Sequence, residues 1–297
     1  MKPQPLSFSS GMLALWVSIL WGGNVVAIKL GLGTLPPFWS AFWRFMVGAA
    51  TVLIWAWIKR AELLPEREDW GSAVILGFLF AAQISCLNLG VSLTSPAYGV
   101  VLLNSHPVFT NLFGHFVDSE DNLNFRRLLG LALAVIGMSY VATGRPDAAL
   151  APNPIAGNLI LILSAALLAT RSLYTRRLVQ RVNTFKPVVW QMSFALPVFL
   201  FFALLLEPPL LKPVTWPPVA AILYQGAIIG GFCFVTWTQL LQKHAAGVLS
   251  MFAFLVPFFG VFLSSYMFDE TINPGLLLGA GLVTSGIVIV TRFSGGK

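Results

Sequence analysis

Polar side chains recur inside one long apolar stretch in the first half of the chain. Asn104, Asn111 and His115 are spaced i, i+7 and i+11, so a helix would place them on one face. His106 and Thr110 form an adjoining strip. Polar groups in apolar surroundings are costly unless they meet partners or water. These residues therefore either bind a polar ligand in a cavity or hold helices together, and we favour the cavity for Asn104 and His106.

Other apolar stretches carry amide and aromatic side chains that suit the same kind of ligand. Amides donate and accept hydrogen bonds, and aromatic rings bury flat apolar groups. Together they predict a site for an amphipathic organic compound, although each aromatic taken singly is better explained by packing. The candidate ligand-binding residues are Trp21, Asn24, Phe80, Gln83, Tyr98, Asn104, His106, Asn111, Arg171, Phe232, Thr236 and Trp237.

Arg171 lies towards the end of its apolar stretch, shortly before Arg176 and Arg177. A guanidinium at that place could clamp the carboxylate of a ligand. The alternative is that the side chain extends along its helix until the charge reaches the polar surface. The sequence favours this second interpretation for Arg171, and the same interpretation applies to Lys29. Arg44 lies deeper in its stretch and is a better candidate for a structural or gating role.

The chain lacks the residue patterns of catalytic and ATP-driven proteins. It has no H-E-x-x-H, G-x-S-x-G or G-x-x-x-x-G-K-[ST] pattern. None of its 11 acidic residues falls in the middle of an apolar stretch. Ser105 and His106 are adjacent, so a helix would point them about 100° apart, which makes a poor catalytic pair. We expect no catalytic residue, metal or cofactor.

The candidate residues must be positioned by long apolar helices. Of the 297 residues, 57% are apolar and 10% are charged, whereas soluble domains are roughly 25% charged. The alternation of a membrane barrel is absent. A helix needs about 20 mostly apolar residues to cross a bilayer. The sequence therefore predicts an all-α integral membrane protein with ten spanning segments, at 10–30, 38–58, 70–91, 96–117, 126–143, 155–175, 187–206, 217–240, 246–267 and 274–292.

Basic residues predict the orientation of these segments. With the N-terminus inside, 13 of the 18 Lys and Arg residues lie on the inner side, and only Arg145 and Lys212 lie in outer loops. Lys and Arg are enriched in cytoplasmic loops, so both termini are expected in the cytoplasm. The same bias accounts for the net charge of +7 without any nucleic-acid partner.

Several residues repeat about half a chain apart. Pro107 and Pro257 are separated by 150 residues, as are Glu120 and Glu270. Four glycines repeat at a spacing of 149 residues, Gly130 and Gly137 with Gly279 and Gly286. This pattern predicts an internal duplication.

The duplication divides the chain into residues 1–146 and 147–297, each with five helices. Because five is odd, the second half enters the membrane from the opposite side. Such inverted repeats are typical of secondary transporters, whose substrate site lies near the midplane between the repeats.

The duplicated prolines are candidate hinges. A proline lacks a backbone donor and pushes away the carbonyl four residues earlier, here that of Leu103 for Pro107 and that of Ala253 for Pro257. Irregular backbone is tolerated in a membrane where it lines a cavity. The alternative is ordinary proline kinking, as expected for Pro197.

The chain resembles the drug/metabolite transporter superfamily, in its EamA-type branch. The resemblance covers the whole chain and rests on the order and duplication of motifs more than on any single one. The residues that carry it are Trp21-Gly22-Gly23-Asn24, Lys29, Arg44, Pro107, Glu120, Gly130, Pro257, Glu270 and Gly279. It implies ten helices, a central cavity lined by helices 1, 3, 4, 6, 8 and 9, and export of small organic metabolites such as amino acids. Arg171 departs from the family pattern, in which an aromatic or aliphatic residue is expected.

We therefore expect a secondary transporter in a bacterial inner membrane, with a small-molecule substrate and the lipid bilayer as its partners. Facilitated diffusion or exchange is the first hypothesis for its mechanism. Efflux of drugs or other metabolites, coupled to protons through His106, is the alternative, because His106 is the one titratable side chain near mid-depth. A membrane-embedded enzyme, a channel and an assembly protein are less well supported. Two G-x-x-x-G pairs, Gly226–Gly230 and Gly275–Gly279, favour close packing within the bundle and leave a monomer or a weak homodimer.

Overall fold

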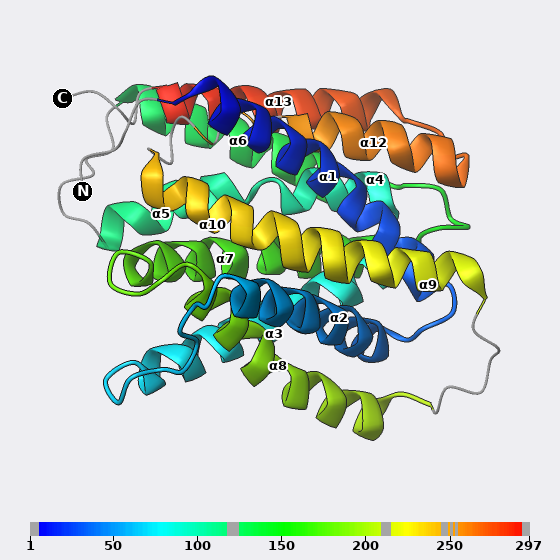
Figure 1. Cartoon of the computed structure of the whole chain (residues 1–297). Coiled ribbons are helices and arrows are strands. Elements are labelled where there is room, and N and C mark those ends of the chain that lie inside the picture. The colour runs from blue at the N-terminus through cyan, green and yellow to red at the C-terminus, as the bar shows by residue number, and fades with distance from the viewer. Residues whose placement is uncertain are drawn as a thin grey trace.

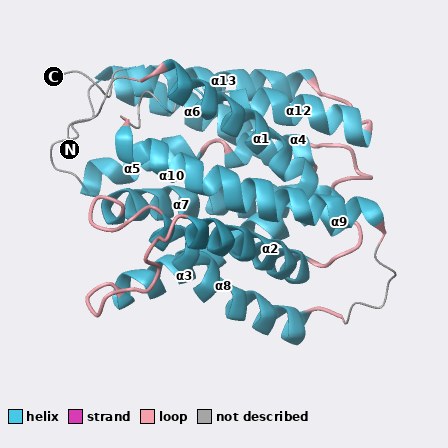
Figure 2. Ribbon diagram, viewed as in Figure 1, coloured by secondary structure: helices cyan, strands magenta, loops and turns pink. Residues whose placement is uncertain are grey.

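The computed structural model describes residues 6–117, 125–208, 215–244, 249, 252 and 255–292. Helices run through all of these segments, and no strand occurs in them (Figures 1 and 2). The elements are α1 (Phe8–Leu32), α2 (Pro37–Ile58), α3 (Trp70–Leu93), α4 (Pro96–Leu103), α5 (His106–Val117), α6 (Phe125–Ala142), α7 (Pro154–Leu178), α8 (Phe185–Leu206), α9 (Trp216–Leu223), η1 (Tyr224–Cys233), α10 (Phe234–Lys243), α12 (Leu255–Phe268) and α13 (Pro274–Arg292).

These helices confirm the all-α membrane fold expected from the apolar segments. Seven of them, counting α9, η1 and α10 as one, are long and apolar enough to cross a membrane, and α12 and α13 add two shorter apolar helices. The fourth expected segment is divided into α4 and α5. Most of the first half of the ninth segment lies outside the described residues.

The break between α4 and α5 falls beside Pro107. Pro107 is the second residue of α5, where the missing N–H does not interrupt a helix. Its neighbours bond to the end of α4: Ser105 Oγ donates to the Leu102 carbonyl at 2.6 Å, and His106 Nδ1 lies 3.3 Å from the Leu103 carbonyl. The proline therefore leaves the Leu103 carbonyl without a helical N–H donor, and this carbonyl faces Nδ1 of His106 instead. Pro257 lies in the first turn of α12, and the corresponding carbonyl of Ala253 lies outside the described residues.

The four duplicated glycines lie where α6 and α13 run side by side (Figure 1). A Cβ added to Gly286 would meet the carbonyl oxygen of Gly130 at 2.5 Å, and one added to Gly137 would meet that of Gly279 at 2.8 Å. Small residues therefore set the distance between these two helices.

The glycines of the G-x-x-x-G pair Gly226–Gly230 also pack inside the bundle. A Cβ on Gly226 would meet the Arg44 carbonyl oxygen at 2.6 Å, and a Cβ on Gly230 would lie 3.7 Å from the Cα of Gly48. This confirms close packing within the bundle as a role for these glycines.

Helix packing has the pattern of a two-fold repeat. The second and seventh spans, α2 and α8, pack against each other, as do the fifth and tenth, α6 and α13. The contact of α1 with α12 corresponds to that of α7 with α4 and α5. The division at residues 146 and 147 stays a prediction.

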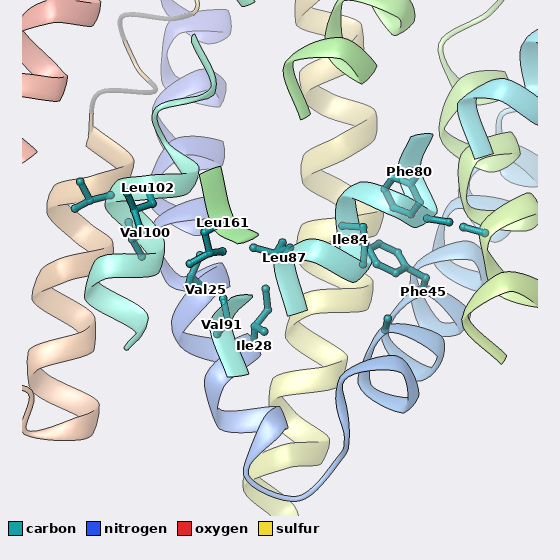
Figure 3. Close-up of a cluster of buried hydrophobic side chains, with 14 of the residues drawn as sticks. Val25, Ile28, Phe45, Phe80, Ile84, Leu87, Val91, Val100, Leu102 and Leu161 are labelled. Carbon is teal, nitrogen blue, oxygen red and sulfur yellow. The ribbon is translucent and has the colours of Figure 1, made fainter. Parts of the chain in front are cut away.

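The apolar core is centred on α3. Phe80, Ile84, Leu87 and Val91 project from α3 towards Phe45, Ile28 and Leu161 of the surrounding helices (Figure 3). Phe45 and Phe80 meet edge to face, with ring centroids 4.7 Å apart. This packing fixes the rotation of α3 and hence the direction of its polar side chains.

Candidate functional site

Arg171 turns into the bundle and not towards the cytoplasmic surface. Its Nη1 donates a hydrogen bond of 2.7 Å to Oε1 of Gln191 on α8. Its guanidinium carbon lies 5.0 Å from the ring centroid of Phe80 on α3 and 5.6 Å from that of Phe234 on α10. The interpretation that Arg171 extends to the inner interface is therefore wrong, because aromatic faces and an amide hold the charge inside the protein.

His106 begins α5, and α5 packs against α7, the helix that carries Arg171. Its Nδ1 faces the Leu103 carbonyl, which can only accept, so Nδ1 carries the proton of that hydrogen bond. Nε2 is then the ring atom that remains for a ligand. We name Phe80, His106, Arg171, Gln191 and Phe234 the arginine cluster.

The arginine cluster lies within the membrane-spanning part of the fold. Arg171 is five residues beyond the midpoint of α7, which at 1.5 Å per residue is about 8 Å towards its C-terminal end. His106 lies at the break in the fourth span, and Phe80 lies near the middle of α3. The other four residues of the arginine cluster lie on four further spans, through α3, α5, α8 and α10.

Gln83 and Ser164 form a second polar contact next to this cluster. Gln83 Nε2 donates to Ser164 Oγ at 3.2 Å, and Ser164 Oγ donates to the Gln83 carbonyl at 3.0 Å. Ser164 precedes Arg171 by two turns on the same face of α7. The contact joins α3 to α7, while Oε1 of Gln83 is buried without a hydrogen bond.

Aromatic residues continue from Phe234 towards α1. Trp21 and Trp237 meet edge to face with centroids 4.9 Å apart, and both belong to one apolar cluster with Phe232 and Phe234. Beside Trp21 in the sequence, Asn24 has a buried Oδ1 without a hydrogen bond. Trp21 and Trp237 thus lie beside the arginine cluster, with Phe234 shared between the two groups.

Other candidate residues lie elsewhere or are engaged by their own surroundings. Tyr98 lines a cavity of about 200 Å³ with Tyr140 and Asn273, between the N-terminal ends of α4 and α13 and the C-terminal end of α6. Asn111 accepts a hydrogen bond of 3.3 Å from Arg127 on α6. Asn104 donates to the Val100 carbonyl of its own helix.

Two candidates on the eighth span face other helices or the interior. Phe232 stacks on Trp55 of α2 with centroids 6.2 Å apart, and Thr236 is buried. The twelve candidates therefore do not meet in one place. The structure adds Gln191 and Phe234, of which Gln191 carried a detectable signal as an amide within an apolar segment.

Charged side chains near the ends of several spans bind backbone groups. Lys29 Nζ donates to the carbonyls of Val91, Thr94 and Leu150 at 2.9, 2.8 and 2.6 Å, so its role is more specific than extension to the surface. Glu270 accepts from Ser264 Oγ at 2.6 Å and from the Ala97 N–H at 3.3 Å. These bonds join the ends of different spans.

Glu207 acts similarly at the start of α2. Its carboxylate accepts the N–H groups of Phe38 and Trp39 at 2.7 and 2.9 Å, which satisfies donors that an α-helix leaves free. Burial raises the pKa of the Glu207 carboxyl, and the two N–H groups partly offset that rise.

Comparison with known proteins explains the two-fold pattern. The model of the EamA-like transporter family matches the chain twice, at residues 9–143 and 155–292. The chain belongs to this family. In this EamA-family transporter, Phe80 and His106 come from the first match, and Arg171, Gln191 and Phe234 come from the second.

Relatives across bacteria share the full length of the chain. A probable amino-acid metabolite efflux pump of Salmonella typhimurium is 27% identical over 96% of this chain and 95% of its own length. The uncharacterized transporter YoaV of Bacillus subtilis is 24% identical over 93% of this chain and 94% of its own. A crystal structure at 20% identity superposes with a TM-score of 0.70 over 97% of this chain and 98% of its own, which shows a shared fold. The family and these relatives are transporters and not enzymes.

Proposed function

We propose that this chain exports small organic metabolites, of the amino-acid or a related amphipathic class, by alternating access around the arginine cluster. The observation that carries the proposal is the meeting of a guanidinium and two aromatic rings from both family-matched halves. Polar groups within a membrane mark substrate pathways. The name of the Salmonella typhimurium relative supports the amino-acid class.

Facilitated diffusion or exchange is the mechanism that the residues favour. The 11 acidic residues all lie at the ends of spans or in loops, so a carboxylate relay across the membrane is absent from the sequence. Proton coupling through His106 is the second candidate, since the contact of Nδ1 with the Leu103 carbonyl leaves Nε2 available to bind a proton.

Flux measurement tests both the proposal and its mechanism. Purified protein in liposomes loaded with labelled amino acids is expected to give saturable efflux that an imposed proton gradient leaves unchanged. His106→Gln is expected to lower the rate and to keep its independence of the gradient. Accumulation that requires a proton gradient, and that His106→Gln abolishes, would instead establish proton coupling. Absence of flux for every amino acid would overturn the amino-acid class.

Pro107 and Pro257 are proposed hinges for the conformational change. The break between α4 and α5 supports this for Pro107, because a segment without continuous helical bonds bends at low cost. Pro107→Ala is expected to slow transport several-fold while the folded protein remains intact. Pro197→Ala, which changes a proline inside α8, is the matched control and should leave the rate nearly unchanged. Equal transport rates for the wild type and Pro107→Ala would refute the proposed hinge role of Pro107.

A bacterial inner membrane with both termini in the cytoplasm is the proposed location. Relatives from Bacillus subtilis and Salmonella typhimurium and the clustering of Lys and Arg support it. A green fluorescent protein fused to the C-terminus should fluoresce, and alkaline phosphatase fused there should be inactive; the reverse would refute this orientation.

A monomer or weak homodimer is proposed, to be checked by light scattering of the purified protein.

A further inference from the structure

We propose that Arg171 binds the carboxylate of the substrate, so that this transporter selects organic carboxylates with an apolar or aromatic body and rejects amines that lack a carboxylate. This inference rests on the proposed function and deepens it.

The charge of Arg171 has no acidic partner in the described part of the chain. Its hydrogen bond goes to the neutral amide of Gln191, and its Nε is buried without a hydrogen bond. The sequence places all 11 carboxylates at the ends of spans or in loops. A buried cation without a counterion is costly, and such residues in membrane proteins mark the sites of charged ligands.

A second buried arginine shows what a structural role looks like in this fold. Arg44 is 2% exposed and donates to Gln225, which is 0% exposed. Gln225 is itself fixed by a hydrogen bond of 2.9 Å from its Nε2 to the Ala27 carbonyl. Arg44 is thus enclosed and its partner is anchored on both sides.

Gln191, the partner of Arg171, is also buried, but Arg171 differs from Arg44 in two respects. It keeps partial exposure although it points into the bundle, and its partner Gln191 has no second hydrogen bond among the described residues. An incoming carboxylate can therefore take the place of the Gln191 oxygen on the guanidinium. Arginine and carboxylate match in geometry, since two parallel N–H donors meet two oxygens.

The neighbouring groups extend this preference to the rest of the ligand. His106 lies on α5, which packs against α7, and it adds a nitrogen side chain and no negative charge, so it offers an ammonium group no opposite charge. Phe80 and Phe234 cover the guanidinium, and Phe234 continues into the cluster of Trp21 and Trp237. A ligand with its carboxylate on Arg171 would lay its apolar body against these rings.

The test compares four compounds that differ in one end group. Phenylalanine, 3-phenylpropanoate, 3-phenylpropanamide and 2-phenylethylamine are added to purified protein in nanodiscs, and binding is measured by thermal shift and by competition for efflux. The two carboxylates are expected to bind at least about tenfold more tightly than the amide and the amine, as a hydrogen-bonded charge pair implies. Equal binding of the amine would overturn the proposal.

Variants separate a binding role from a structural one. Arg171→Gln is expected to lose about tenfold or more in carboxylate affinity, and Arg171→Lys to lose less. Arg176→Gln removes the same charge from an exposed position on α7 and is expected to bind like the wild type. Gln191→Ala removes the amide that a carboxylate would have to displace, so carboxylate affinity is expected to rise. A fall in that affinity for Gln191→Ala, or equal affinities for Arg171→Gln and Arg176→Gln, would overturn the clamp.

The two proposals fail in different ways. If carboxylates bind in a way that depends on Arg171 but no flux is seen, the transport mechanism is refuted and the binding role of Arg171 stands. If amines are transported, and Arg171→Gln transports them as well, the binding role of Arg171 is refuted and the transport function stands. If Arg171→Gln does not fold, Arg171→Lys and the four-compound series still decide the matter.

Discussion

Gly286→Ala is expected to lower the melting temperature of the purified protein by several degrees. The new Cβ would lie 2.5 Å from the Gly130 carbonyl oxygen and 2.6 Å from the Ala134 backbone nitrogen. Backbone atoms cannot rotate away as a flexible side chain can, so α13 must move away from α6 along their shared face. Overpacking of this kind costs about 1–3 kcal/mol. Thermal unfolding in detergent, followed by intrinsic fluorescence, measures the change.

The control is a glycine on the same helix that faces no neighbour. A Cβ added to Gly281 meets nothing within 4 Å. Gly281→Ala should therefore leave the melting temperature unchanged or raise it slightly, because alanine is the better helix former by about 1 kcal/mol. A loss of stability in Gly281→Ala equal to that in Gly286→Ala would show that the close approach of α6 to Gly286 is not the cause of the loss.

The spanning helices were predictable because their signal is local. A run of about 20 apolar residues with few charges leaves few alternatives to a membrane helix. The pairing of α6 with α13 was partly visible as well, since Gly130, Gly137, Gly279 and Gly286 recur at one spacing. The break at Asn104 and Ser105 was expected near Pro107, but its exact residues depend on the bonds that Ser105 and His106 make to the end of α4.

The site was less predictable because it depends on how each helix is rotated. Arg171 has the same sequence context whether it extends to the surface or turns inward, and the position of Gln191 on α8 decides between these directions. Phe234 is one of 24 phenylalanines, and nothing in its neighbourhood in the sequence sets it apart. Its contact with Arg171 joins residues 63 positions apart in the chain, which no local pattern encodes.

Spacing on an ideal helix also misplaced part of the polar strip. Asn104 and Asn111 would share a face only if one continuous helix joined them. The break between α4 and α5 changes their relative direction, so Asn104 bonds to its own helix and Asn111 lies beside Arg127. Tyr98 lies near the N-terminal end of α4 and lines a cavity there with Tyr140 and Asn273.

Gln225→Leu is expected to be among the most destabilising substitutions in the chain. The amide of Gln225 accepts from Arg44 Nη1 at 2.9 Å and donates to the Ala27 carbonyl at 2.9 Å, so one side chain joins α1, α2 and η1. Leucine would leave the guanidinium over the Phe45 ring, 4.4 Å from its centroid, as its main remaining contact. Leaving a buried donor without its hydrogen-bond partner costs about 1–3 kcal/mol, and more when the donor is charged. Thermal unfolding and the yield of monodisperse protein measure this loss.

The double variant Arg44→Leu/Gln225→Leu shows whether the unpaired charge causes the loss. With both polar groups gone, no buried cation remains, and apolar replacement of a buried polar pair is often neutral. The double variant is therefore expected to recover most of the stability that Gln225→Leu loses. Gln242→Leu changes an exposed glutamine on α10 and serves as the control, with little effect expected. If the double variant is no more stable than Gln225→Leu, the main role of Gln225 is its bond to the Ala27 carbonyl, and α1 rather than α2 is the helix that it holds in place.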